Sequence, residues 1–171
     1  NEFILRAQRK RGRVMAKKTG VYPVYENQFQ VNTGAAAKAG TDGKSVTGGT
    51  FVQIADMESF SVSFDNGVEE WKPFDQEGWA RRLMTAKSVT ISVSGKRNVG
   101  DAGNDYVGGL AFKSGRDAEA DFQWTFPDGT KVVFLGAVLN IKEFGAGDST
   151  SVAPLSFDAM SNGKPIVVPA V

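Results

Sequence analysis

Residues Gly43-Lys44-Ser45 have the side chains with which a phosphate-binding loop ends. Such a loop requires Gly-x-x-x-x-Gly-Lys-Ser/Thr, because successive backbone N–H groups must curl around the phosphates at the start of a helix. The first glycine would stand at position 38, where this chain has Lys38. No buried strand precedes the motif and no helical pattern follows it, so the spacing excludes this kind of nucleotide site.

A second candidate is a calcium loop that would begin at Asp101 and include Asn104 and Asp105. A calcium loop needs glycine at its sixth position and glutamate at its twelfth, where this chain has Tyr106 and Phe112. Capping of a helix N-terminus explains these polar residues better.

Two weaker patterns remain. Residues 145–150 resemble a dinucleotide-binding turn, but threonine replaces the third glycine and no helix follows. The acid pairs Glu69-Glu70 and Asp75/Glu77 have the residue types of a glycosidase, yet such pairs are common on solvated edges. Neither pattern predicts a catalytic site.

The most restrictive feature of the composition is the absence of histidine and cysteine. Without them the chain lacks the commonest general base, the commonest metal ligand, disulfides and every Ser-His or Cys-His arrangement. We therefore predict no catalytic residue, no metal site and no cofactor.

The chain has 171 residues, of which 41% are hydrophobic and 23% charged, as expected for one globular domain. No apolar run approaches the roughly 20 residues that span a bilayer. Phe3-Ile4-Leu5 is too short for the core of a signal peptide, so we expect synthesis in the cytoplasm without export by the usual route.

Charge is distributed unevenly along the chain. Residues 1–14 carry five basic side chains against one glutamate, a net +4, which leaves −3 for the rest of a chain whose total is +1. Because Met15 looks like a natural start, residues 1–14 are interpreted either as a vector-derived leader or as a basic N-terminal arm. The arm lacks aromatic residues between its basic ones, which disfavours nucleic-acid binding.

From Gly20 onward the dominant hydrophobic period is two. Residues 60–64, 89–93 and 122–126 alternate apolar and polar side chains, as strands with one buried face do. Residues 131–141 are more continuously apolar, which is typical of a strand buried on both faces.

Turn motifs separate these runs. Asn66-Gly67 fits a two-residue hairpin turn, Pro127-Asp128-Gly129 presets a reversal, and Asn162-Gly163 repeats the first motif. Three hairpins in so short a chain predict a mainly β protein.

One segment has a helical pattern. Asp101 is an N-cap residue, an acidic first turn follows it, and Gly115 can end a helix that covers 101–112. One face of this helix is apolar, but two adjacent glycines inside it each cost about 1 kcal/mol relative to alanine, so it must pack on a sheet. The face consists of Tyr106, Val107, Leu110 and Ala111, and the glycines are Gly108 and Gly109.

A long segment without clear structure, residues 33–49, separates a strand near 25–31 from one that starts at Phe51. Its only bulky apolar residue is Val46, and stretches of this length within a compact domain are uncommon. It is either a tolerated surface insertion or a segment that orders against another subunit. Its glycines and lysines are Gly34, Lys38, Gly40, Gly43, Lys44, Gly48 and Gly49.

The order of features from Trp71 to Pro165 is more specific than any single motif. Tryptophans, turn glycines and basic residues follow one another at fixed places: Trp71, Gly78, Trp79, Arg81, Gly95, Arg97, Gly100, Asp101, Trp124, Pro127, Gly129, Gly163 and Pro165. In this order the chain resembles the major tail tube protein of long-tailed (siphovirus-type) bacteriophages and related prophages. The resemblance covers about residues 15–171 and does not include residues 1–14.

The resemblance implies a tail tube domain over 15–171, in which two packed β-sheets form a sandwich or barrel with one short flanking helix. It implies hexameric rings that stack into a hollow tube, with residues 33–49 as the loop that contacts the adjacent ring. Its implied partners are further copies of itself, other tail proteins at the tube ends, and DNA that passes through the lumen without sequence-specific binding. The implied location is the virion tail, assembled in the host cytoplasm, with no membrane involved.

Two other classes of function stay open. A monomeric carbohydrate-binding β-sandwich would use exposed aromatic residues, and Trp71, Trp79 and Trp124 are the candidates. A glycosidase would depend on Glu69 or Glu70.

The tube hypothesis also predicts where charge lies. A basic lumen would hold DNA through many phosphate contacts and slow its passage. We therefore expect lumen-facing residues to be mostly Asp, Glu, Ser, Thr and Gln. The basic residues expected on the outer surface or between subunits are Lys72, Arg81, Arg82 and Lys113.

Overall fold

A computed structural model describes residues 19–171; the basic segment 1–14 lies outside these residues. In chain order the elements are η2 (Val24–Glu26), β1 (Gln28–Asn32), β2 (Lys38–Ala39), β3 (Val46–Thr47), β4 (Phe51–Gln53), β5 (Met57–Trp71), η3 (Phe74–Gln76), β6 (Arg81–Lys96), α2 (Ala102–Gly108), η4 (Gly115–Ala118), β7 (Glu119–Thr125), β8 (Lys131–Phe144), β9 (Pro154–Met160) and β10 (Ile166–Val168). Within the described residues, no helix is long and apolar enough to cross a membrane.

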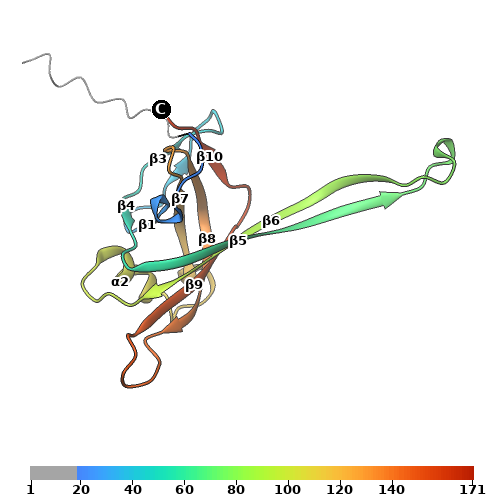
Figure 1. Ribbon diagram of the computed structural model, residues 1–171. Coiled ribbons are helices and arrows are strands. Elements are labelled where there is room, and N and C mark those ends of the chain that lie inside the picture. The colour runs from blue at the N-terminus through green and yellow to red at the C-terminus, as the bar shows by residue number, and fades with distance from the viewer. Residues whose placement is uncertain (1–18) are drawn as a thin grey trace, which may run out of the picture.

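Eight strands form one antiparallel sheet in the order β4-β1-β7-β8-β9-β6-β5, with β10 also beside β8. The first half of β8 pairs with β7 and β10, and its second half pairs with β9. Gly136, whose φ of 62° is a conformation that other residues rarely adopt, lies at a bulge against β7, two residues before Val138, where pairing with β9 begins. The bend allows one strand to belong to two parts of the sheet (Figure 1).

The sheet folds over so that its two ends face each other across the core. The rings of Phe29 in β1 and Phe60 in β5 lie 4.8 Å apart, and those of Phe122 in β7 and Phe157 in β9 lie 6.0 Å apart. The predicted mainly β class with one short flanking helix is confirmed. The two layers, however, belong to one continuous sheet, with only the small β2–β3 pair separate.

The predicted period of two is visible in β6 but not in β7, where residues 120–123 are all buried. Val89, Ile91 and Val93 are buried, while the residues between them are half-exposed. In β7, Phe122 is fully buried, and Trp124 packs against the core at its edge. The prediction of burial on both faces for 131–141 holds only at Val133 and Phe134, because the other residues of β8 are buried on one face at most and the strand ends in an exposed stretch.

Asp101 caps the predicted helix, since its side chain accepts a 2.9 Å hydrogen bond from the Asn104 N–H. Helix α2 ends at Gly108, earlier than the predicted 112, and Phe112 is exposed. The two adjacent glycines explain the early end, because neither favours continuation of a helix. Gly103 allows α2 to approach the backbone of β4.

One predicted turn is wrong. Asn66-Gly67 lies inside β5, opposite Lys87 and Ala86, and a bulge follows at Gly67/Val68. The hairpin instead reverses at 72–80, through η3 and Gly78. The turn residues Asn and Gly also suit a bulge within a long strand, which the local pattern did not distinguish.

The other two predicted turns differ in outcome. Pro127-Asp128-Gly129 does connect β7 to β8, closed by the hydrogen bond from Phe126 N to Thr130 O at 2.8 Å. Asn162-Gly163 connects β9 to β10, but both strands pair with β8 and not with each other, so this connection is not a hairpin.

We expect Gly103→Ala to destabilise the fold by about 1–3 kcal/mol, the usual cost of overpacking. A Cβ at this position would clash with the Gln53 carbonyl group. It would lie 2.8 Å from the carbonyl carbon of Gln53 and 3.1 Å from the Cα of Ile54. The matched control is Gly109→Ala, where φ is −65° and the nearest atoms are 3.3 Å away. Urea unfolding measures both, and equal stabilities would contradict the close approach of α2 to β4.

Candidate assembly surfaces

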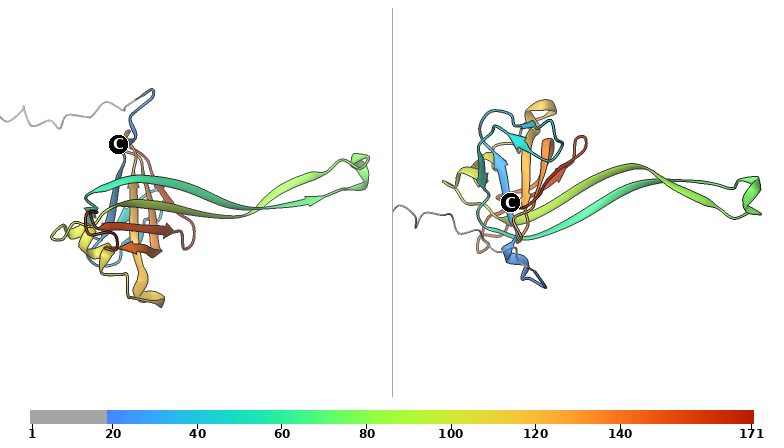
Figure 2. Two further views of the ribbon diagram at one scale, coloured as in Figure 1. Left: turned by 60° about the horizontal axis from the view of Figure 1, so that its bottom comes forward. Right: turned by 90° about the horizontal axis from the view of Figure 1, so that it is seen from above.

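The hairpin of β5 and β6 extends far beyond the rest of the sheet (Figures 1 and 2). Its strands pair with each other up to Trp71 and Arg81, whereas β9 accompanies β6 only over residues 90–96. Residues 65–88, here called the arm, are therefore a two-stranded ribbon. Such a ribbon is only marginally stable in water by itself, so we expect the arm to be stabilised by contact with another molecule.

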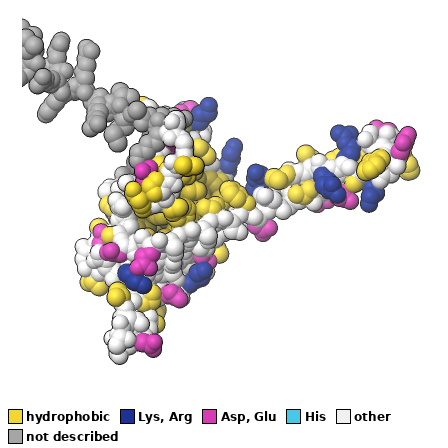
Figure 3. All heavy atoms as spheres, in the orientation of Figure 1, with side chains coloured by type: hydrophobic (Ala, Val, Ile, Leu, Met, Phe, Trp, Pro, Cys, Tyr) yellow, Lys and Arg dark blue, Asp and Glu magenta, His cyan; other side chains and the backbone are white. Residues whose placement is uncertain are grey.

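The arm and its root expose large apolar side chains, which are visible along its length in Figure 3. Phe74 is fully exposed and Trp79 is 78% exposed. Exposed apolar residues in such number on one projection are unusual for a monomer and mark an interaction surface. The others are Phe64, Val68, Trp71, Leu83 and Met84.

One ion pair and one cation–π contact join the two strands of the arm near its end. Glu70 accepts from Arg82 at 2.7 Å and lies 3.6 Å from Lys72, and the Arg81 guanidinium lies 6.0 Å from the Trp71 ring centroid. Exposed pairs of this kind contribute about 0.2–1 kcal/mol each. They therefore add little to the backbone pairing that joins the two strands.

The acid pairs considered for glycosidase chemistry do not form a site. Glu69 and Glu70 are neighbours on one strand, so their side chains point to opposite faces. Asp75 and Glu77 lie in the exposed turn at the end of the arm. Neither pair faces another carboxylate across a cleft.

The face of β5, β6 and β9 that points away from the core is rich in hydroxyl groups. Ser59 and Ser94 share a 2.7 Å hydrogen bond, and Ser92 donates to Asp158 at 2.6 Å. Asp158 also pairs with Lys142 at 3.1 Å, so its charge is compensated. This polar face consists of Ser59, Ser61, Ser63, Thr90, Ser92, Ser94, Ser156 and Asp158.

An apolar groove of about 740 Å³ lies on the other side of the hairpin root. Figure 3 shows the apolar surface gathered where the arm leaves the body. Val62 and Phe64 of β5 form one wall, and Trp124 and Phe126 lie opposite them. Sequence reasoning missed this groove, because its walls come from strands far apart in the chain.

Trp124 is not free to stack on a sugar. Its ring lies 4.3 Å from that of Phe126 and 5.5 Å from that of Phe60, and its indole N–H donates to Asn27 at 2.9 Å. Trp71 and Trp79 are exposed, but they lie on the arm, away from Trp124. The three tryptophans therefore do not form one aromatic platform.

The predicted structureless segment 33–49 contains the β2–β3 hairpin and is tied to the body, so that description was wrong. The buried carboxylate of Asp121 accepts from Asn32 Nδ2 and Ala37 N, both at 2.9 Å, and from Gly136 N at 2.9 Å. Asn32 Oδ1 closes the base of the segment by accepting from the N–H of Thr50. An inter-ring role for this segment stays a prediction.

Within this segment, Gly43-Lys44-Ser45 forms a tight turn around Asp42. Its carboxylate accepts from Lys44 N at 3.0 Å and Ser45 Oγ at 2.7 Å. The Lys44 N–H, followed by the Ser45 hydroxyl, holds the pKa of Asp42 below its usual value. The backbone N–H of Lys44, which a phosphate would use, therefore already donates to a carboxylate.

A polar cluster fixes the start of α2. Arg97 pairs with Asp105 at 2.7 Å and donates to Asn104 Oδ1 at 2.9 Å. Asn104 is fully buried and donates to the carbonyls of Ala55 and Lys96. The hydrogen bond from Arg97 is the main cause that lowers the pKa of Asp105.

The positions that carry the resemblance fall into three separate places. The arm holds the first group, Trp71, Gly78, Trp79 and Arg81. The end of β6 and the connection to α2 hold Gly95, Arg97, Gly100 and Asp101. The β7–β8 turn and the β9–β10 connection hold Trp124, Pro127, Gly129, Gly163 and Pro165.

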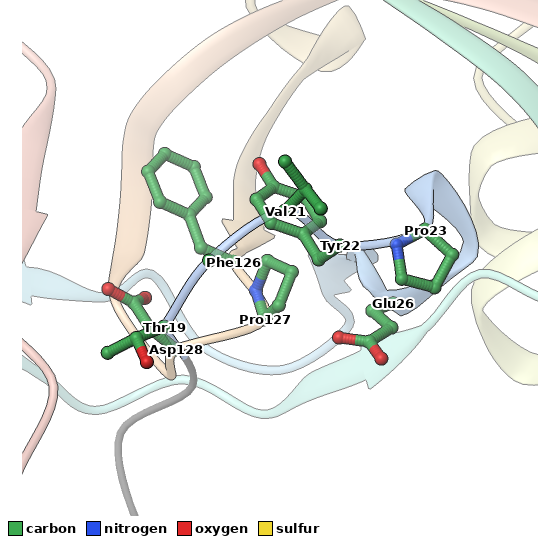
Figure 4. Close-up of a pocket in the computed structure, with 9 residues that line it drawn as sticks. Thr19, Val21, Tyr22, Pro23, Glu26, Phe126, Pro127 and Asp128 are labelled. Carbon is green, nitrogen blue, oxygen red and sulfur yellow. The ribbon is translucent and has the colours of Figure 1, made fainter.

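A smaller cavity of about 290 Å³ lies where residues 19–23 cross the β7–β8 turn. Figure 4 shows its two carboxylates, Glu26 and Asp128, at opposite ends. It therefore has no paired acids for catalysis. Among residues 19–171, no group of acidic residues is clustered closely enough to hold a metal ion.

Solved structures with this fold come from tail-bearing particles and injection systems. A chain from the virion of a native gene transfer agent particle matches with a TM-score of 0.64 and 17% identity, covering 87% of this chain and 100% of that one. A chain from the tail of the empty particle, with C6 symmetry, matches with a TM-score of 0.61 and 18% identity over 85% of this chain and 97% of that one.

A chain from the PVC sheath–tube complex of an extracellular contractile injection system matches with a TM-score of 0.55 and 15% identity, over 88% of this chain and 93% of that one. No protein-family model and no curated protein matches the sequence. The resemblance to tail tube proteins is thus confirmed at the level of the fold.

We expect Asp121→Ala to destabilise the protein by about 1–3 kcal/mol, because it leaves buried N–H donors without an acceptor. Hydrogen exchange of residues 33–50 should rise most, since Asp121 joins this segment to the body. The control is Asp42→Ala in the exposed turn of the same segment, where faster exchange should stay local. Unchanged exchange of 33–50 in Asp121→Ala would contradict the anchoring role.

A pH effect follows from Asp105. Its pKa is lowered in the folded protein from the ordinary 3.8, so its ion pair stabilises the fold above that pH, and the stabilisation is lost as pH falls through the folded value. Wild type should exceed Asp105→Asn in stability at about pH 6, and the difference should shrink below 3.8. Urea unfolding across this range measures it, and a difference that does not change with pH would refute the role of the carboxylate.

Proposed function

We propose that the chain is a structural subunit of a phage-type tail tube, in which six copies form a ring and rings stack into a hollow tube for DNA. The observation that carries this proposal is the arm, an apolar ribbon that leaves a closed core and has no partner within the described chain. The sixfold tail with the same fold supports the ring size. The subunit belongs in the virion tail, is assembled in the host cytoplasm, and has no enzymatic activity.

The polar face fits the wall of the lumen. Its groups are mostly hydroxyls, its lysines are paired, Lys142 with Asp158 and Lys96 with Glu58 at 3.6 Å, and Glu143 adds a negative charge opposite Ser156. A surface of this kind offers DNA few attractive phosphate contacts. The basic residues predicted to avoid the lumen are off this face: Lys72, Arg81 and Arg82 are on the arm, and Lys113 follows α2.

The projecting segments supply the contacts between copies. The edge strands β4 and β5 leave backbone groups that a neighbour in a ring can pair with. The segment 33–49 remains our proposed contact with the adjacent ring, and the arm is a second, longer projection that the sequence did not predict. Other tail proteins would cap the tube ends.

A monomeric carbohydrate-binding module is the alternative, since Trp71 and Trp79 are exposed. It is disfavoured because Trp124 is engaged in the core and the other two lie on a ribbon. Electron microscopy of the purified full chain tests both functions. Sixfold rings or tubes support the tube subunit, whereas a monomer at every concentration with sugar-dependent tryptophan fluorescence would support the alternative.

The assignment of the lumen is tested by cysteine labelling, because the natural chain has no cysteine. Ser61→Cys on the polar face should react with a maleimide on a protein-sized carrier in free subunits and stop reacting in assembled tubes. The control, Ser114→Cys beside η4, is exposed and off the polar face, and should react in both states. Equal labelling of Ser61→Cys in tubes and free subunits would refute this orientation.

A further inference from the structure

We infer that the end of the arm in one copy seats in the apolar groove at the hairpin root of a second copy. The inference deepens the proposed function, since it names the two surfaces that join subunits. It follows from three properties of the described residues: the shape and lining of the groove, the side chains at the end of the arm, and the distance between the two.

The groove suits a partner segment that has apolar side chains with acidic residues next to them. Its volume is about 740 Å³, and its floor and walls are aromatic and aliphatic. Its only charged lining residues are Lys87 and Lys164, which are both exposed, so the rim is positive and has no carboxylate. Removal of the apolar lining from water favours binding of an apolar segment. The two lysines favour a segment that also carries negative charge beside its apolar side chains.

The end of the arm has these properties. Residues 73–79 present Phe74 and Trp79 to solvent, with Asp75 and Glu77 between them and no basic residue. Burial of two such aromatic side chains removes about 150–250 Å² each from water.

The turn at the end of the arm is also ordered in advance. Trp79 N donates to the Gln76 carbonyl at 2.8 Å, and Gln76 N donates to the Pro73 carbonyl at 3.3 Å. Pro73 fixes its own φ, which limits the conformations of the turn before binding. A preorganised turn loses less entropy when it docks.

The segment that binds in the groove must come from another copy. Phe64 lines the groove, and Trp71 stands seven residues further along an extended strand, roughly 23 Å away at 3.3 Å per residue. The arm points away from its own body in every view (Figures 1 and 2). Because the end of the arm and the groove are different surfaces, the contact is head-to-tail, and each copy can both give an arm and receive one.

Charge reversal tests the contact in the full chain. Lys87→Glu/Lys164→Glu in the groove and Asp75→Lys/Glu77→Lys on the arm should each weaken association about tenfold or more, because like charges would face each other. The four substitutions together should restore it. The control is Lys113→Glu/Arg116→Glu, which changes two exposed basic residues near α2. Sedimentation velocity measures association, and circular dichroism verifies that each variant is folded.

Recovery in the combined variant supports the inference. Association equal to wild type in the groove and arm variants overturns it, as does a combined variant that associates no better than the single sets.

Disulfide formation gives an independent readout. A mixture of Phe74→Cys and Val167→Cys chains should form a cross-linked pair upon oxidation, since Val167 lines the groove and is exposed. The control mixture pairs Phe74→Cys with Phe112→Cys, an exposed aromatic position outside the groove. A yield no higher than in the control overturns the inference.

The two proposals fail in different ways. Tubes in the microscope without the specific cross-link would leave the tube function standing and refute the contact between arm and groove. The cross-link in a protein that forms neither rings nor tubes would support the contact and refute the tube function.

Discussion

The bend in β8 is the constraint on which the rest of the structure depends. Because β8 pairs with β7 in its first half and β9 in its second, one sheet can supply both layers of the core. Phe122 contacts Phe134 and Phe157 across this fold, and all three rings are buried. Asp121, next to them, accepts the Gly136 N–H at the bend, so the bend and the anchor of residues 33–49 share one carboxylate.

The closed core explains why the arm projects. Strands β5 and β6 are longer than the part of the sheet that they complete, since β9 ends opposite Thr90. Beyond this point the ribbon has no layer to pack on, and its apolar residues remain exposed. The same strands carry the polar face on one side and a wall of the groove on the other. One hairpin thereby contributes to the arm, the polar face and the groove.

The local sequence predicted those features that depend on local geometry. Alternation in 89–93 identified a buried strand face, and Asp101 identified the start of α2 through its capping bond. Alternation in 122–126 did not, because Gln123 is buried beside Phe122. The turn predicted at Asn66-Gly67 was wrong, because the same two residues fit both a hairpin turn and a bulge inside a long strand. The segment 33–49 looked structureless because its anchor, Asp121, lies more than 80 residues away in the chain.

By itself, the sequence determined that the protein is mainly β, that it has no histidine and no cysteine, and that its ordered motifs resemble a tail tube protein. The first two conclusions rest on composition and on the two-residue period of a strand, which need no knowledge of strand partners. The third rests on the resemblance carried by the order of residues from Trp71 to Pro165. Only the tertiary structure decided that one sheet folds into two layers, that Trp124 is engaged while Trp79 is exposed, and that a groove lies at the root of the arm. Such features depend on which distant strands pair and where that pairing stops, and a local pattern does not contain that information.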